Sequence, residues 1–276
     1  MVVPDVFINS LSKFDFSSAT ARIVMSIPGS HPISSCQYGK LGLSKQLTSI
    51  GLRSGQTNNN RSLRLECQGS SIGNYTNSWL NDFYRCASGY PPTSNDLSKR
   101  PLPDIKVVYP TLQTVKSSKG GIEGGGTLFC NRSTWIKPGF PTEIFYDCLS
   151  KRDGVLMHVK MILGLFDKTG SSSVEDSKKP STSKDVANQP DDDDRAVGFL
   201  YVGSHNFTPA AWGRFQSKKP SKDYTSIEIS NWELGVVLPI VSESQIDETV
   251  PWKRPLKRYG HSGKDSQVPW MQFSHR

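Results

Sequence analysis

The sequence contains no apolar run near the roughly 20 residues that a membrane-spanning helix needs. Its first residues, MVVPDVF, lack a basic segment followed by a long apolar one, so we expect an intracellular protein without a secretory signal or a membrane partner. The five cysteines are an odd number without any CxxC pair, which argues against a disulfide framework and a zinc site. Acidic residues are a minority, 25 against 33 Lys and Arg, and four of them cluster at residues 191–194.

The resulting net charge of +8 suits a polyanionic partner, because neutralising phosphates releases condensed counterions. A chain of 276 residues is long enough to bury a sizeable core, and we expect one domain over residues 1–276. Residues 168–195 have almost no apolar content, so we expect a disordered loop there. The sequence thus predicts a basic globular domain with one long insertion.

Helical and strand patterns alternate along the chain. Apolar spacing and capping signals predict helices over residues 4–18, 40–52, 77–88, 142–152 and from 209 onward. Short apolar runs predict strands over residues 21–29, 104–111, 155–166, 196–206, 224–240 and at the start of 64–73. Residues 119–127, KGGIEGGGT, predict a loop whose backbone approaches another group closely, and residues from 243 onward are expected to be irregular. The alternation indicates an α/β sandwich with a mixed β-sheet.

Two polar side chains interrupt one of the apolar runs. His158 and Lys160 lie two residues apart on the expected strand, so both would project from one face. Buried charge needs a partner, and an anionic substrate would supply it. Further on, Asn206 ends a small-residue turn after the next expected strand. A structural histidine and an ordinary turn explain these residues equally well when each motif is taken alone.

Taken together, HxK and GSxN resemble the signature of the phospholipase D superfamily. Most members have Asp six residues after the lysine, where this chain has Phe166, and the tyrosyl-DNA phosphodiesterase family is the branch that lacks it. The segments LMHVKM, GFLYVGSHNFTPAAWG and SNWELGVVLP resemble the second HKD half of that family. Upstream, IKVVYPT and GGIEGGGTL resemble its earlier segments, and RYGHSGKDSQVPW resembles its C-terminal motif. The resemblance spans nearly the whole chain and implies a phospholipase D-like α-β-α sandwich.

The resemblance also implies roles for four residues at the reaction centre. His158 matches the general acid that protonates the departing tyrosine oxygen and then activates water as a base. Lys160 and Asn206 match groups that bind phosphate oxygens. Glu233 matches the acidic residue that orients the nucleophilic histidine of the first HKD motif. No metal and no cofactor is implied, because lysines and histidines supply the positive charge.

Other residues match the family's contacts to its substrate. Ser70, Ser71, Thr127 and Thr208 match positions that hydrogen-bond the DNA backbone. Trp270 lies where the family presents aromatics near the peptide side of the groove, although core packing explains it equally well. The implied partners are DNA with a 3′-phosphotyrosyl or other 3′ adduct, a topoisomerase I-derived peptide, and an N-terminal HKD domain that this chain does not contain.

The family's activity would be hydrolysis of 3′-phosphotyrosyl bonds on single-stranded DNA during repair in the nucleus, through a phosphohistidine intermediate. The first HKD motif is absent, because no other histidine in the chain is followed by Lys two places on. We therefore expect this chain to be the C-terminal half of such an enzyme and inactive alone. Two alternatives stay open: a non-catalytic nucleic-acid-binding module with the same fold, and a homodimeric nuclease in which each copy contributes one motif.

Overall fold

The computed structural model describes residues 9–52, 62–90, 92, 99–167, 197–217 and 223–272. The loop predicted at residues 168–195 lies outside this part of the chain. No helix among the described residues is long and apolar enough to cross a membrane.

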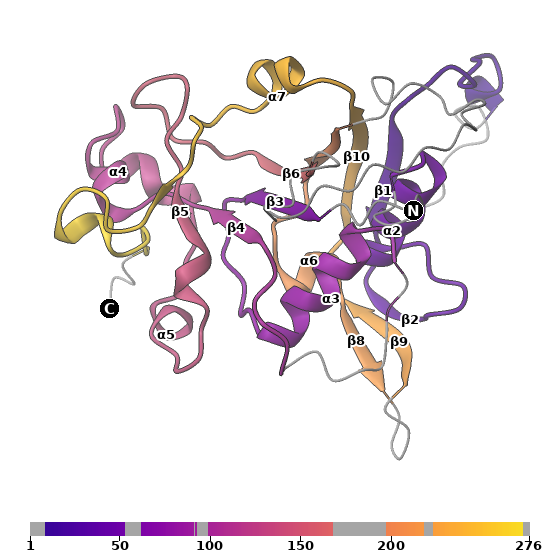
Figure 1. The fold of residues 1–276 in the computed structure, drawn as a ribbon, viewed down its shortest axis with the longest axis horizontal. Helices are drawn as coiled ribbons and strands as arrows, with labels where there is room; N and C mark the ends of the chain where they lie inside the picture. The colour runs from indigo at the N-terminus through magenta and orange to yellow at the C-terminus, as the bar shows by residue number, and fades with distance from the viewer. Residues whose placement is uncertain are drawn as a thin grey trace, which may run out of the picture.

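A large mixed sheet forms the centre of the molecule (Figure 1). Its strands, in spatial order, are β1 (Arg22–Ser26), β10 (Glu233–Ile240), β7 (Gly198–Gly203), β6 (Lys160–Phe166), β3 (Leu63–Gln68), β4 (Ile105–Val108), β5 (Phe145–Asp147) and β11 (Lys257–Arg258). The pairs β3–β4 and β4–β5 are parallel and the other pairs are antiparallel. The predicted mixed sheet is therefore confirmed.

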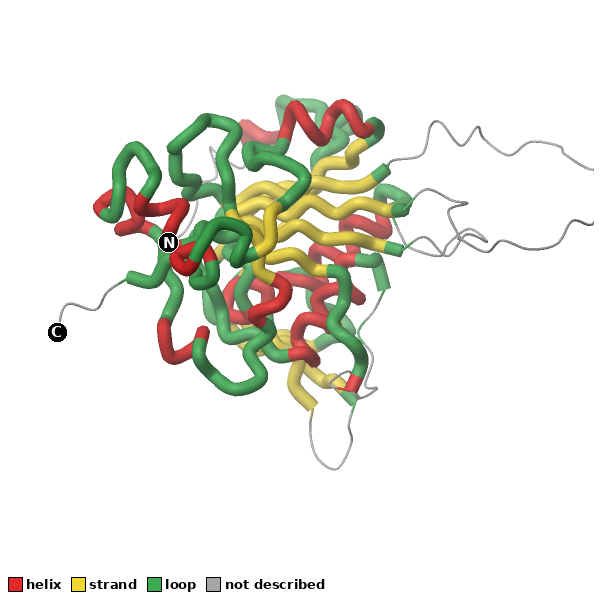
Figure 2. Tube along the Cα trace, turned by 60° about the vertical axis from the view of Figure 1, so that its left-hand side comes forward, coloured by secondary structure: helices red, strands yellow, loops and turns green. Residues whose placement is uncertain are grey.

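Helices cover both faces of this sheet, as Figure 2 shows. On one side lie α2 (Gly39–Ser49), α3 (Asn77–Ala87) and α6 (Pro209–Trp212), and on the other lies α7 (Glu243–Thr249). A second, smaller sheet joins β2 (Gly29–Pro32), β9 (Tyr224–Ile229) and β8 (Arg214–Ser217). The remaining short helical turns are α4 (Leu112–Lys116), η2 (Glu123–Thr127), α5 (Arg132–Trp135), η3 (Thr142–Ile144) and η5 (Lys264–Ser266). This layering confirms the expected α-β-α sandwich.

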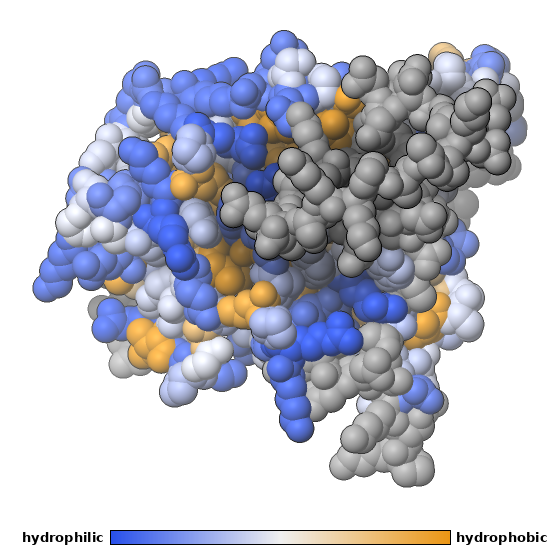
Figure 3. Space-filling model, viewed as in Figure 1, coloured by the Kyte–Doolittle hydropathy of each residue, from blue (hydrophilic) through white to orange (hydrophobic). Residues whose placement is uncertain are grey.

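Aromatic packing fixes the α3 and α6 layer on the sheet. Phe83 lies edge-on to Phe207 at 4.9 Å and to Trp212 at 5.3 Å between ring centroids, and each such pair contributes about 0.5–1.5 kcal/mol beyond its buried area. Helix α3 begins at Asn77, as predicted, and Thr76 is its N-cap, whose side chain accepts a hydrogen bond from the Trp79 amide at 3.2 Å. On the face in Figure 3, hydrophilic residues predominate among the coloured atoms, as a covered core requires.

Four local predictions were wrong. Residues 142–152 form η3 and then β5 instead of a helix, because Phe145 pairs with Val107 in the sheet. Residues from 243 are not irregular at first, since Ser242 caps α7. The helix expected over residues 4–18 does not continue beyond residue 11, and Phe14 is exposed. Strand β6 begins at Lys160 and not at residue 155.

Candidate active site

Four strand ends that carry the predicted reactive residues meet at one edge of the sheet. Lys160 at the start of β6 pairs with Gly203 at the end of β7, and Gly203 pairs with Gly235 near the start of β10. On the other side, the end of β3 pairs with the start of β6. Because neighbouring antiparallel strands run in opposite directions, the start of one lies beside the end of the next. The fold therefore brings together segments that lie more than 160 residues apart.

His158 and Lys160 are close together, although not for the predicted reason. His158 precedes β6 by two residues, so the two side chains do not share a strand face. The chain instead turns so that Lys160 Nζ lies 3.4 Å from His158 Nδ1 and 3.3 Å from the His158 carbonyl oxygen. A 3.4 Å hydrogen bond is long and weak. The histidine is exposed at the open edge and the lysine is half-buried behind it.

The charges around this pair favour the binding of an anion. Burial lowers the pKa of Lys160, while the nearby Glu233 carboxylate acts in the opposite direction. Burial and the positive charge of Lys160 lower the pKa of His158. In the free site, the neutral form of the imidazole is therefore favoured more than it is for a histidine in water. A bound phosphate would favour protonation of the imidazole.

Asn206 is held in one orientation by the turn after β3. Its Oδ1 accepts hydrogen bonds from the Ser70 amide at 2.9 Å, the Ser71 amide at 3.0 Å and the Ser70 hydroxyl at 3.2 Å. The amide nitrogen Nδ2 must then point away from these donors, and it has no hydrogen-bond partner within the described residues. Gly69 leaves room beside it, because a Cβ there would make a tight contact of 3.2 Å with Oδ1. Asn206 thus presents a free donor three residues after Gly203, the residue that pairs with Lys160.

His205, next to Asn206, anchors this turn from inside the core. Its Nε2 lies 2.9 Å from the Ser26 hydroxyl, which itself donates to the Ala211 carbonyl at 2.6 Å. Ser26 can then only accept from His205, so Nε2 carries the hydrogen and Nδ1 accepts from the Tyr201 hydroxyl. Burial lowers the pKa of His205 to about 3. His205 is therefore a neutral structural residue, in agreement with the absence of a lysine two places after it.

Glu233 is oriented by two residues that the sequence did not single out. Its Oε2 accepts from the Ser204 hydroxyl at 2.5 Å and its Oε1 accepts from Asn231 Nδ2 at 3.0 Å. Ser204 Oγ also accepts from the Leu234 amide at 2.9 Å. Both residues lie inside the motifs GSHN and SNWELG. Their polar side chains close to the predicted Glu233 were the signal from which sequence analysis could have identified them.

The predicted DNA-contacting residues fall into two groups. Ser71 is half-exposed and bridges to Phe129, Thr127 is exposed at the end of η2, and Thr208 caps α6 by accepting from the Ala211 amide at 3.3 Å. Ser70 is only 2% exposed, and its hydroxyl and amide are used to hold Asn206. In this structure Ser70 orients Asn206, and its expected contact with DNA stays a prediction.

Trp270 does not present its ring to a groove. It is 3% exposed, and its indole Nε1 donates to the Gly125 carbonyl at 2.9 Å. A Cβ at Gly125 would lie 2.5 Å from the ring, so the predicted close approach of the glycine-rich segment is confirmed. That segment contains the η2 turn rather than being irregular throughout. Trp270 packs against η2, as the core-packing interpretation expects.

No group of three or more His, Cys, Asp or Glu side chains that could hold a metal ion occurs in the ranges that the structure describes. The cysteines there are all buried and unpaired.

Comparison with known proteins shows the family to which the chain belongs. The chain is 24% identical over 238 residues to tyrosyl-DNA phosphodiesterase 1 of Drosophila melanogaster, covering 84% of this chain but 36% of that protein. The fold is similar to the crystal structure of the yeast tyrosyl-DNA phosphodiesterase, with a TM-score of 0.58 at 16% identity over 93% of this chain and 59% of the yeast chain. The chain thus spans about a third of its curated relative. A model of the tyrosyl-DNA phosphodiesterase family matches residues 3–272, and the chain belongs to that family.

Proposed function

We propose that this chain supplies one half of a phosphodiesterase site that hydrolyses 3′-phosphotyrosyl and related 3′ adducts on DNA. The observation that carries the proposal is the convergence of His158, Lys160 and Asn206 at one open edge of the sheet. Lys160 and the free Nδ2 of Asn206 would donate to the non-bridging phosphate oxygens, where charge develops in the transition state.

His158 would act as the general acid and base. A phosphate bound at Lys160 favours the imidazolium form, which can protonate the departing tyrosine oxygen. After the leaving group departs, the neutral imidazole can take a proton from the attacking water. The nucleophile in this scheme is the histidine of a first HxK motif, which would form the phosphohistidine intermediate.

The surroundings of Glu233 support a site that is completed by another half. Its carboxylate is fixed by Ser204 and Asn231 at the sheet edge and has no histidine partner in the described residues. Beside it, Leu234 and Met25 face each other across β10 and β1 and are 62% and 37% exposed, and Trp232 is 74% exposed. An apolar surface of this kind next to a functional carboxylate is typical of a protein interface, and we assign it to the half that carries the first motif.

The strip formed by Ser71, Thr127, Thr208 and Phe129 would hold the DNA strand. Hydroxyl groups contact backbone phosphates without reading sequence. Phe129 is 47% exposed and pairs with Ser71, so a base can stack on its ring. The substrate strand would therefore run from this strip to Lys160.

The test is an assay of the chain alone and with a first-motif half from the family, on a 3′-phosphotyrosyl single-stranded oligonucleotide. We expect negligible turnover by the chain alone, and turnover in the combination that disappears in His158→Ala but persists in the matched control His31→Ala. Robust turnover by the chain alone, lost in His158→Ala, would instead support the homodimeric nuclease. DNA binding without turnover in either mixture would support the non-catalytic module.

A further inference from the structure

A polar cavity lies outside the proposed catalytic edge, between α4, the loop at residues 148–157 and the C-terminal segment. Its volume is about 480 Å³. The cationic and hydroxyl side chains that line it are Thr114, Ser117, Ser118, Ser150, Lys253, Lys257, His261 and Ser262, and its apolar side chains are Leu149, Val155 and Leu156. None of these residues takes part in the proposed phosphodiester chemistry.

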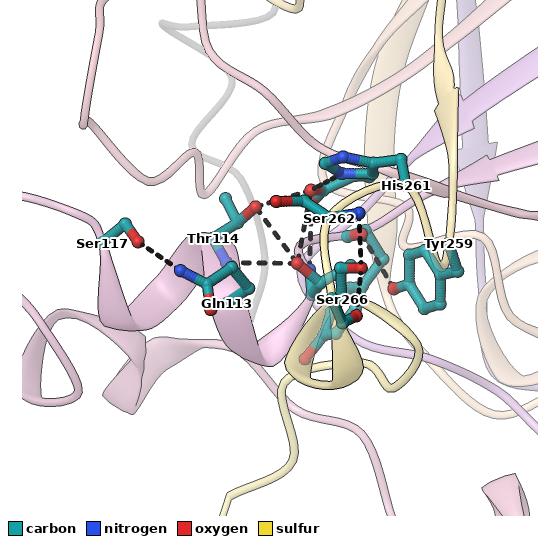
Figure 4. A network of polar contacts seen from close by, with 11 residues as sticks. Gln113, Thr114, Ser117, Tyr259, His261, Ser262 and Ser266 are labelled. Carbon is teal, nitrogen blue, oxygen red and sulfur yellow. Dashed lines mark hydrogen bonds and ion pairs between the residues drawn. The ribbon is translucent and has the colours of Figure 1, made fainter.

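A buried carboxylate fixes the orientation of His261 at this cavity. Asp147 ends β5 with a fully buried side chain, and its Oδ2 accepts from His261 Nε2 at 2.8 Å and from the Thr114 hydroxyl at 2.6 Å. Its Oδ1 accepts from the Thr111 amide at 3.0 Å. Figure 4 shows this network, with Thr114 on α4 and His261 on the C-terminal segment. Both oxygens of Asp147 therefore accept hydrogen bonds inside the protein, and the carboxylate itself does not line the cavity.

The segment that carries His261 is itself held in place. The Ser262 amide donates to the Ser266 hydroxyl at 2.9 Å, and Ser266 donates to the Gly263 carbonyl at 2.7 Å. Lys116 of α4 forms an ion pair of 2.6 Å with Asp265. These contacts fix the cavity wall before any ligand arrives, which reduces the entropy cost of binding.

Several donors in the cavity are uncommitted. Ser117 accepts from Gln113 Nε2 at 2.9 Å and Ser150 accepts from the Arg152 amide at 3.0 Å, so each hydroxyl hydrogen remains free to donate. Lys257 forms no ion pair with the residues that the structure describes. The one lining carboxylate, Asp153, is already paired with Lys253 at 2.5 Å. The balance of charge and of free hydrogen-bond donors therefore favours an oxyanion.

We propose that this cavity binds a phosphate monoester, with the phosphate on Lys257, His261 and the free serine hydroxyls. The apolar wall formed by Leu149, Val155 and Leu156 would contact the organic part of the ligand. The cavity exceeds the volume of a bare phosphate, which is the reason for assigning an ester rather than the free ion. Since Leu156 precedes His158 by two residues, an occupant would also contact the segment that leads to the catalytic edge. This proposal is independent of the phosphodiesterase assignment.

The experiment is a titration of the ¹⁵N-histidine-labelled chain, in which only five histidines give signals. It uses the Lys160→Ala background, which removes the main charge at the catalytic edge. Phenyl phosphate and inorganic phosphate are compared with benzyl alcohol, which lacks the charge. We expect saturable shifts of the His261 signals with both phosphates, tighter binding of phenyl phosphate, and no saturable effect of benzyl alcohol.

Variants of exposed lysines separate a built site from non-specific attraction. Lys257→Ala should weaken phenyl phosphate binding about tenfold, the loss expected for one charge-assisted hydrogen bond. Lys137→Ala, which removes an exposed lysine outside the cavity, should leave binding unchanged. Equal weakening in both variants, or no saturable shift of His261 with either phosphate, overturns the proposal. Binding of phenyl phosphate in a chain without phosphodiesterase activity would support the cavity proposal even if the proposed function fails.

Discussion

Acid should destabilise the chain through His205, which the fold keeps neutral. Burial lowers its pKa to about 3 in the folded state, against about 6.5 for an unfolded histidine. A group whose folded pKa is depressed contributes stability that is fully present above the unfolded pKa. That contribution is lost as the pH falls from about 6.5 toward about 3. Protonation also gives Nδ1 a hydrogen that faces the Tyr201 hydroxyl, so this oxygen would have to accept it and re-aim its own hydrogen.

The size of the effect follows from the two pKa values. Between about pH 7 and about pH 4.5 the unfolded state binds nearly a full proton that the folded state does not bind. This difference lowers the free energy of unfolding by about 2.5 kcal/mol. Because the same ring anchors the turn that carries Asn206, the catalytic edge should loosen together with the core.

Urea unfolding of the wild type and of His205→Gln as a function of pH measures this directly. Buried and paired carboxylates titrate in the same range in both proteins, so the difference between the two curves isolates the histidine. We expect His205→Gln to be less stable at neutral pH and to lose less stability on acidification, whereas His31→Gln should follow the wild-type slope. Parallel pH slopes for wild type and His205→Gln would refute the reasoning.

Three further predictions concern single contacts. Phe129→Ala should weaken binding of a single-stranded oligonucleotide by about 1–3 kcal/mol if one base stacks on the ring, as fluorescence anisotropy would show; an unchanged Kd removes Phe129 from the strip. Asn206→Asp should keep an oxygen against the Ser70 and Ser71 amides and replace the free donor Nδ2 by an acceptor. We therefore expect kcat of the completed enzyme to fall about a hundredfold or more, with little loss of melting temperature. A normal kcat would mean that Nδ2 does not contact the reacting phosphate. Arg254→Ala should destabilise the fold by about 3–5 kcal/mol, because Glu66 is buried and paired with this guanidinium at 3.1 Å. Trp252 Nε1 also donates to Glu66 at 2.7 Å, and a change below about 1 kcal/mol in urea unfolding would show that Trp252 alone satisfies the carboxylate.

The strands that form the catalytic edge were predictable because their sequences are locally unambiguous. Apart from Lys160 at the start of β6 and Glu233 at the start of β10, the runs that became β6, β7 and β10 consist of apolar residues, glycine, proline and tyrosine. Residues 142–152 have helical apolar spacing as well, but pairing of Phe145 with Val107 overrides it. A local pattern carries no information about a partner that lies far away in the chain.

The same limit applies to the site. Motif spacing identified Asn206, yet its orientation depends on Ser70 and Ser71, more than 130 residues upstream. The family resemblance also suggested a position for Trp270 near the peptide side of the groove, whereas the ring is buried and packs against Gly125. Exposure of an aromatic side chain is decided by tertiary packing, and no feature of the surrounding sequence reports it.

The central claim is that His158 acts as general acid and then as base, and trapping of the covalent intermediate tests it most directly. The chain is combined with a first-motif half and given a labelled 3′-phosphotyrosyl oligonucleotide, and the products are resolved on denaturing gels. Tyrosine is a good leaving group that needs little protonation, so attack should continue in His158→Ala while hydrolysis of the phosphohistidine lacks its base. The covalent protein–DNA adduct should then accumulate in His158→Ala, whereas Lys160→Ala should slow both steps without accumulation. Cleavage at the normal rate with no adduct in His158→Ala would contradict the account.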